Sequence, residues 1–321
     1  MRSAGSLSLD LDDLWSYLKT HGDDWRDLPS FLPTVVPRVL QLLAEHDLTI
    51  TFFVVGQDAA LPQNRETLSS IAASGHEVAN HSFHHEPWLH RYSRTDIEVE
   101  VARAEEAIES AVGARPIGFR GPGYSLSEDT LRTLVARGYL YDATSLPTFV
   151  GPLARAFYFR RSRLSPAERQ ERSALFGSFG DGFQPLTPYL WDLDGGSILE
   201  IPVTTMPYLR VPFHFSYLLY LARISPGLAR RYLAWALTLC QRSRIAPSLL
   251  LHPLDLLGSE DVGELRFFPG MDISRGEKIE RVREYLSMIM ERFDLGPVGS
   301  RASVLTDTEI AVREPRLRKA S

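Results

Sequence analysis

The chain alternates short apolar strands with amphipathic helices from residue 6 to residue 142, and this alternation restricts its fold more than any other feature. Residues 36–43 carry apolar side chains at helical spacing. Residues 48–56 are β-branched and aromatic on both faces, as expected of a strand that is covered on both sides. Repeated strand–loop–helix units predict parallel strands whose functional side chains lie at the C-terminal ends.

The length and composition suit one large domain. With 321 residues, 44% of them hydrophobic, the chain can bury the full core of an α/β barrel. We expect a single domain over residues 1–298 and a loosely held polar tail over residues 299–321. The formal net charge of −5 argues against nucleic-acid binding. We find no signal peptide and no apolar run long enough to span a bilayer, so we expect a cytoplasmic location.

Residues 151–245 interrupt the alternation and are expected to form a basic, partly helical insert. Residues 151–250 contain 12 Arg or Lys against 6 Asp or Glu. Residues 213–240 are rich in Tyr, Leu and Trp, and predict two helices hinged at residues 225–227. Such helices either pack on the barrel with their Arg side chains reaching outward or lie on an anionic membrane surface.

Two histidines four residues apart, His81 and His85, follow the third expected strand in the run H-S-F-H-H. Two imidazoles at this spacing can meet one cation, and the acidic residues Asp10, Asp12 and Asp13 at the end of the first strand can supply a carboxylate. Two His and one carboxylate, with one position open for water, are typical of a catalytic zinc site. The neighbouring His84 is expected to lie outside the ligand set.

Two further side chains, Arg120 and His252, stand at the ends of later strands and should reach the same face of a parallel barrel. Arg120 could hold a basic Asp in its ionised form, and His252 could protonate a leaving amine. Asp142 either orients His252 or caps a turn. Asp255 either lies beside His252 or is an ordinary surface carboxylate. The whole set suits the metal-assisted hydrolysis of an amide.

Seven ordered pieces of the chain resemble the polysaccharide deacetylase family, also called NodB-homology or carbohydrate esterase family 4-like proteins. They are L-S-L-D-L-D-D, T-F-F-V-V-G, G-H-E-V-A-N-H-S-F-H-H, F-R-G-P-G-Y, Y-D-A-T-S, E-I-P-V-T and L-L-L-H-P, within roughly residues 6–292. The resemblance implies an α/β fold, a distorted (β/α)7 TIM-like barrel. It also implies a divalent-metal deacylase, with Zn2+ as the expected metal and Co2+, Mn2+ or Ni2+ as alternatives.

The first departure from the family pattern concerns the carboxylates. Most members have two adjacent ones, the first acting as base and the second as metal ligand, whereas this chain has Asp10-Leu11-Asp12. This D-x-D form is similar to the branch that includes lipid-linked aminoarabinose deformylases and some peptidoglycan deacetylases. Residues two apart on a strand project to the same side, which favours Asp10 as base and Asp12 as ligand. In the alternative register, Asp12 is the base and Asp13 the ligand.

The second departure concerns the R-x-P-Y motif, which is replaced here by Arg120-Gly121-Pro122-Gly123, with Tyr124 displaced by one residue. We assign Gly123 and Tyr124 to the substrate and oxyanion position. The backbone N–H of Gly123 can still supply an oxyanion contact. The displacement weakens a role for the Tyr124 side chain.

These features together predict a zinc-dependent enzyme that removes an acetyl or formyl group from an amino sugar in a polysaccharide, glycoconjugate or lipid-linked sugar. The expected ligands are Asp12, His81 and His85, with Asp10 as base and His252 as acid. The enzyme would be cytoplasmic, with peripheral contact to an anionic inner membrane face if the insert lies on lipid. Two alternatives are a ring-opening amidohydrolase that acts on a small cyclic ureide and a degenerate barrel that serves as a binding module.

Overall fold

A computed structural model describes residues 2–26, 28–153, 156, 164, 169–170, 179–305 and 310–315. The basic run at residues 160–163 and parts of the expected insert and tail lie outside the described residues.

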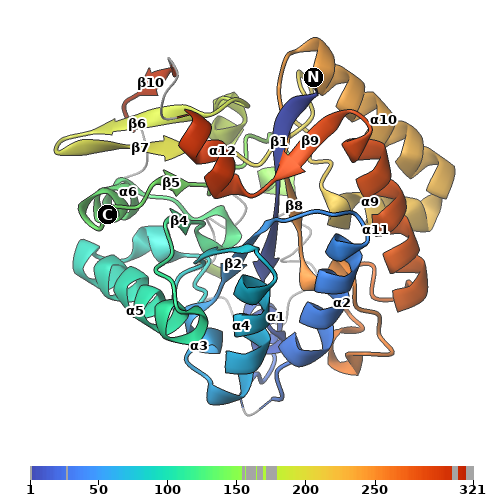
Figure 1. Cartoon of the computed structure of the whole chain (residues 1–321), viewed down its shortest axis with the longest axis horizontal. Coiled ribbons are helices and arrows are strands. Elements are labelled where there is room, and N and C mark those ends of the chain that lie inside the picture. Colours follow the sequence, from blue (N-terminus) through green and yellow to red (C-terminus); the bar gives the residue numbers. More distant parts are fainter. Residues whose placement is uncertain are drawn as a thin grey trace.

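Seven parallel strands of the described chain form a barrel (Figure 1). They are β1 (Ser3–Leu11), β2 (Thr51–Val54), β3 (Glu77–Asn80), β4 (Gly118–Phe119), β5 (Tyr141–Asp142), β7 (Gly196–Glu200) and β8 (Ser248–Leu251). Their order is β7-β5-β4-β3-β2-β1-β8, and each neighbouring pair is parallel. The segment after β7 closes the ring, because the Thr204 N–H donates to the Ser248 carbonyl oxygen at 2.9 Å. The predicted (β/α)7 barrel is therefore confirmed.

The central strand β1 separates apolar from polar side chains by its alternation. Leu7, Leu9 and Leu11 are buried in the main apolar cluster, together with side chains of the covering helices. Ser8 and Asp10 point to the opposite side and contact Arg120 in the barrel interior. Successive side chains of a strand project to opposite faces. Strand β1 therefore contributes apolar side chains to the core on one face and polar side chains to the barrel interior on the other.

Helices cover the outside of the barrel, and Figure 1 shows α5 and α6 on one side and α9, α10 and α11 on the other. The helices of the first half are α1 (Leu14–His21), α2 (Leu32–Ala44), α3 (Gly56–Ala59), α4 (Arg65–Ala73), α5 (Arg94–Val112) and α6 (Glu128–Ala136). The helices of the second half are α9 (Phe215–Ile224), α10 (Pro226–Arg242), α11 (Arg275–Met290) and α12 (Val298–Leu305). Among the described helices, none is both long and apolar enough to cross a bilayer.

The described part of the insert contributes a hairpin of strands and a hairpin of helices. Strand β6 (Tyr189–Leu193) pairs antiparallel with β7, and β7 itself belongs to the barrel. Helices α9 and α10 meet at Ser225, whose side chain accepts a hydrogen bond from the Leu228 N–H. Phe215 and Leu218 of α9 are fully buried. The predicted pair of helices is confirmed, and one side of it packs on the barrel.

The chain beyond residue 298 is packed where a loose tail was expected. Val298 and Ala302 of α12 are buried, and the Gly299 N–H donates to Glu77 Oε2 at 2.8 Å. A Cβ at Gly299 would meet the Glu77 carboxylate at 2.3 Å, so a small residue is needed for this approach. Further on, β10 (Val312–Arg313) pairs with β6. The expectation of a tail is therefore wrong for these residues, because the apolar side chains of α12 pack into a hydrophobic cluster and its backbone hydrogen-bonds to Glu77.

Candidate active site

Asp12, His81 and His85, here called the metal group, converge where β1 and β3 end. All three are buried, and their ligand atoms lie within 4.8 Å of one another. Asp12 Oδ1 is 3.0 Å from His85 Nε2 and 3.5 Å from His81 Nε2. Yet this buried oxygen accepts no properly aligned hydrogen bond in the described structure. Two imidazole nitrogens and one carboxylate oxygen directed at one point are a fitting donor set for Zn2+.

The charge states of the metal group also fit a cation. His81 Nδ1 donates to the Arg120 carbonyl oxygen at 2.7 Å, which leaves the lone pair on Nε2 facing Asp12. Burial lowers the pKa of His81, so the imidazole is neutral near pH 7. Burial alone would raise the pKa of Asp12, but the imidazoles of His85 and His81 outweigh it and lower this pKa to about 2.

The loop that carries the two histidines is held from outside by Glu100 of α5. Ser82 and His85 both have positive φ values, of 60° and 50°. Glu100 Oε2 accepts the N–H groups of Phe83 at 3.2 Å and of His84 at 2.9 Å. The His84 ring also contacts Glu100, so it lies outside the metal group as predicted.

Glu100 was not identified from the sequence, although a signal for it exists. It stands in the buried stripe of α5, between Ile97, Val101 and Ala104. A carboxylate on an apolar helix face needs a hydrogen-bonding partner, and here the partner is the loop backbone.

Arg120 and Asp10 form an ion pair in the barrel interior. Arg120 is fully buried, and its Nη1 lies 2.6 Å from Asp10 Oδ1. The guanidinium also donates to Ser8 Oγ at 2.8 Å and to the Ala143 carbonyl oxygen at 2.9 Å, and lies 4.1 Å from the centre of the Phe53 ring. A buried arginine held at this many points fixes the position of the Asp10 carboxylate.

Asp13 has a structural position. Its Oδ1 accepts the Leu14 N–H at 2.7 Å, which caps α1, and the Phe31 N–H at 2.9 Å. Burial raises the pKa of Asp13 in spite of these hydrogen bonds. The geometry thus places Asp12 in the metal group and Asp13 at a helix terminus.

His252 follows β8 and is held by two neighbours. Its Nδ1 lies 3.1 Å from Ser216 Oγ of α9, and its backbone N–H donates to Asp255 Oδ2 at 2.9 Å. Asp255 is only 2% exposed, so it lies beside His252, and the surface alternative is wrong. Burial raises the pKa of Asp255, against the opposing effects of His252 and Ser216.

Asp142 does not orient His252. Its carboxylate accepts the Thr144 hydroxyl and faces Glu200 at the end of β7. Burial raises the pKa of Asp142, and burial together with the Asp142 charge raises that of Glu200 well above its usual range. In the buried wall of the barrel, each of these two carboxyl groups thus lies in surroundings that disfavour its ionised form.

His214 is a second histidine on the side of His252 that was not identified from the sequence. It precedes α9, and its ring centre lies 6.0 Å from that of His252 and 4.7 Å from that of Tyr217. Both ring nitrogens are buried without a hydrogen-bond partner in the described structure. Burial, with His252 and Arg120 nearby, lowers its pKa well below the usual value. A lone histidine in an apolar stretch carries no motif that would have revealed it.

Gly123 and Tyr124 lie in a short 3-10 helix, Pro122–Tyr124, and both have positive φ values, of 58° and 61°. A Cβ at Gly123 would lie 2.9 Å from the Pro87 Cβ, so glycine suits this position for two reasons. Burial and the Asp10 charge raise the pKa of Tyr124.

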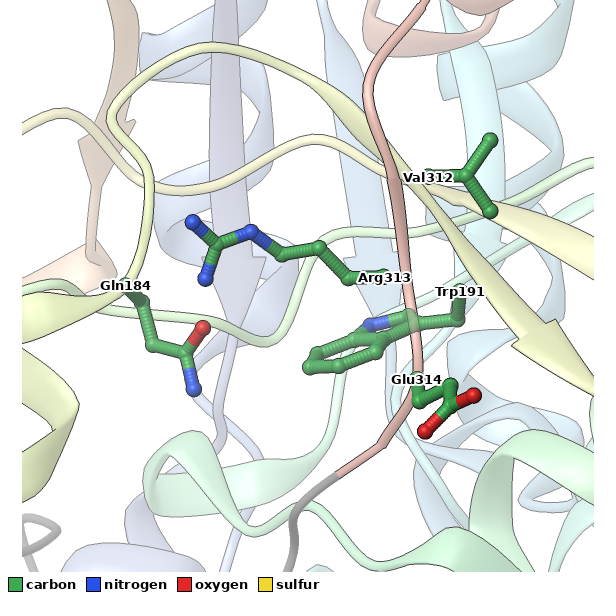
Figure 2. A pocket seen from close by; sticks show the side chains of 5 residues that line it. All are labelled: Gln184, Trp191, Val312, Arg313 and Glu314. Carbon is green, nitrogen blue, oxygen red and sulfur yellow. The ribbon is translucent and has the colours of Figure 1, made fainter.

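Two hollows on the described surface lie outside the metal group. One of about 520 Å³ is lined by Gln184, Trp191, Val312, Arg313 and Glu314 at the outer hairpin (Figure 2). A second of about 310 Å³ lies outside the histidine loop, beside His84 and Glu100. Neither of these two hollows contains the metal group. The candidate site is therefore assigned from the chemistry of its side chains and not from a surface cavity.

Residues 6–141 match the model of a family described as polysaccharide deacetylase. The chitooligosaccharide deacetylase of Sinorhizobium fredii is 37% identical over 107 residues, which are 33% of this chain and 48% of that protein. The chitin deacetylase of Colletotrichum lindemuthianum is 31% identical over 118 residues, which are 36% of this chain and 47% of that protein. The matched segment thus spans about half the length of these curated relatives.

Two solved structures share the whole fold. A Mycobacterium smegmatis protein assigned as a polysaccharide deacetylase has a TM-score of 0.58 at 19% identity, over 98% of this chain and 95% of that one. The allantoinase Puue has a TM-score of 0.56 at 15% identity, over 96% and 91% of the two chains. At such identities the likeness concerns the barrel alone.

Proposed function

We propose that the chain, of which residues 6–141 match the polysaccharide deacetylase family, is a metal-dependent hydrolase that removes an acetyl or formyl group from the nitrogen of an amino sugar. The observation that carries this proposal is the meeting of the metal group with the buried Asp10–Arg120 pair. His252 stands at the end of β8, on the other side of β1 from the histidine loop.

The metal group would hold the cation, and Zn2+ is the metal that two imidazoles and one carboxylate favour. When bound, such a cation polarises the substrate carbonyl and lowers the pKa of water. The protein's own contribution here is to keep His81 neutral and Asp12 ionised, and to hold both in place before the cation arrives.

Asp10 is the proposed general base. Arg120 holds its carboxylate by the ion pair, so Asp10 can accept the proton that the attacking water loses as its oxygen bonds to the acyl carbon. Asp12 is then the ligand. This assignment is supported by the position of Asp13, whose Oδ1 is already occupied by two backbone N–H groups.

His252 is the proposed general acid. Its Nδ1 is engaged with Ser216, which leaves Nε2 to deliver a proton to the nitrogen of the breaking C–N bond. Water and amide are thereby converted into a carboxylic acid and a free amine. We place the Gly123 N–H at the developing oxyanion, and we assign no chemical step to the Tyr124 hydroxyl.

The test is the release of acetate and formate by the Zn2+-loaded protein from nucleotide-linked, lipid-linked and polymeric N-acyl amino sugars. Asp10→Asn is the inactive control, and chelator-treated protein is the metal-free control. We expect release from at least one class that both controls abolish. Ring opening of a cyclic ureide without action on any sugar would assign the other reaction class. Tight metal binding without any hydrolysis would instead indicate a binding module.

A further inference from the structure

Large apolar side chains remain exposed on the outer side of α9 and α10, at positions that align along each helix. On α9 they are Tyr217, Tyr220 and Ile224, and on α10 they are Leu228 and Trp235. Spacings of three, four and seven residues place each set on one face of its helix. Ile224 is 73% exposed and Trp235 51%. We call this surface the hairpin face, and Figure 1 shows both helices at the outer edge of the molecule.

A neighbouring loop extends the hairpin face. Tyr208 is 76% exposed, and Leu209 beside it is also exposed. The Ser243 hydroxyl, at the C-terminal end of α10, donates to the Tyr208 hydroxyl at 3.3 Å, which places the loop against that end. Exposed aromatic and aliphatic groups therefore follow the hairpin from the Ser225 hinge to the end of α10. Several large apolar side chains exposed on adjoining elements mark an interaction site more often than a single exposed side chain does.

The charged side chains of the segment that forms the hairpin face have a single sign. Residues 201–254 contain six Arg, no Lys and no Asp or Glu. Two of the arginines are paired with acidic residues: Arg223 contacts Asp272 at 2.6 Å, and Arg230 contacts Glu284 of α11 at 2.8 Å.

The other arginines of α10 belong to the hairpin face itself. Arg231 and Arg242 are exposed and stand in helical register with Leu228 and Trp235. The face thus combines aromatic groups with unopposed positive charge.

The hairpin face begins at the proposed acid. Ser216, in the first turn of α9, lies 3.1 Å from His252. The next residue, Tyr217, is at once part of the face and in edge contact with His214. A substrate presented by whatever covers this face would therefore arrive beside His252.

We infer that the hairpin face rests on an anionic lipid bilayer and brings the site to amino sugars held at that surface. Aromatic and aliphatic groups would enter the headgroup region while Arg231 and Arg242 contact lipid phosphates. A second copy of the chain would bring like charge against like charge, so the lipid surface is favoured by charge complementarity. The location of the substrate rests on the proposed function, whereas the binding to lipid does not.

The experiment is co-sedimentation of the full chain with vesicles of phosphatidylcholine alone or mixed with phosphatidylglycerol, at low and high salt. We expect binding to the mixed vesicles at low salt and release at high salt. Arg231→Gln with Arg242→Gln should weaken binding roughly 30-fold, because each basic residue contributes about a factor of five. Leu228→Ser with Trp235→Ser should weaken it several-fold at both salt concentrations.

The matched control is Arg94→Gln with Val99→Ser on α5, where both side chains are exposed, and it should bind as the wild type does. Three results would overturn the inference. They are no sedimentation with mixed vesicles at low salt, equal loss in the α5 control, and a dimer in analytical ultracentrifugation that the Leu228 and Trp235 substitutions dissociate. Vesicle binding requires no turnover, so its failure would be distinct from failure of the proposed reaction.

Discussion

Glu100 should control the metal affinity of a site that it does not enter. Its carboxylate accepts two backbone N–H groups, those of Phe83 and His84, in the loop between His81 and His85. Two residues of that loop, Ser82 and His85, hold left-handed backbone conformations, which cost about 1–2 kcal/mol each for residues other than glycine. The hydrogen bonds from the Phe83 and His84 N–H groups to Glu100 offset this backbone strain, so without the Glu100 carboxylate the strain is uncompensated.

The size of the effect of Glu100→Ala follows from these contacts. A buried donor left without a partner costs about 1–3 kcal/mol. Because His84 is partly exposed, water can compensate for one of the two losses in part, so we expect a total of about 2–3 kcal/mol. This corresponds to a roughly 30- to 150-fold higher Kd for Zn2+, at the upper end of the effect typical of residues that support metal ligands. Glu100→Gln keeps one acceptor oxygen and should lose less.

The assay is calorimetric or competitive titration of the chelator-treated protein with Zn2+. Glu105→Ala is the matched control, because Glu105 is a buried acid of the same helix that pairs instead with Arg115 and Arg137. Wild-type affinity in Glu100→Ala would refute the reasoning. An equal loss in Glu105→Ala would show that the helix, and not the loop contact, sets the affinity.

Three further outcomes are expected. Asp10→Asn should keep stoichiometric Zn2+ and lose turnover, whereas Asp12→Asn should lose the metal; the reverse result in metal analysis would reject the assigned register. Ser216→Ala should lower kcat several-fold with little change in KM, because the His252 ring loses the hydrogen bond that holds its Nδ1; an unchanged kcat would show that Ser216 does not position the proposed acid. Burial lowers the pKa of Lys278 from 10.5 to about 8. Between these two pH values the unfolded chain binds more protons than the folded chain, so the contribution of Lys278 to stability rises with pH. The free energy of unfolding of the wild type relative to Lys278→Met should therefore increase by up to about 3 kcal/mol across that window, and a flat or falling difference in denaturant titrations would contradict this.

The sequence by itself determined the barrel and the two histidines of the metal group, whereas the structure separated Asp12 from Asp13. Strand and helix periodicities are local properties of the chain, and parallel strands must place their C-terminal ends on one face. The positions of His81, His85 and the acidic residues at the end of β1 were therefore sufficient to predict that the two imidazoles lie close to a carboxylate. The pairing of Arg120 with Asp10 followed in the same way.

The tertiary structure alone decided which side chains support that site. Glu100 reaches the histidine loop from a helix that follows it, and Ser216 reaches His252 from 36 residues away. From the sequence, both Asp142 and Asp255 were candidate neighbours of His252. In the folded chain Asp142 faces Glu200, and Asp255 accepts a hydrogen bond from the His252 N–H. Such contacts depend on how helices are seated against the barrel, which is set by the fit of many side chains over long sequence separations. No local periodicity encodes that fit, so these partners became visible only when the elements were placed together.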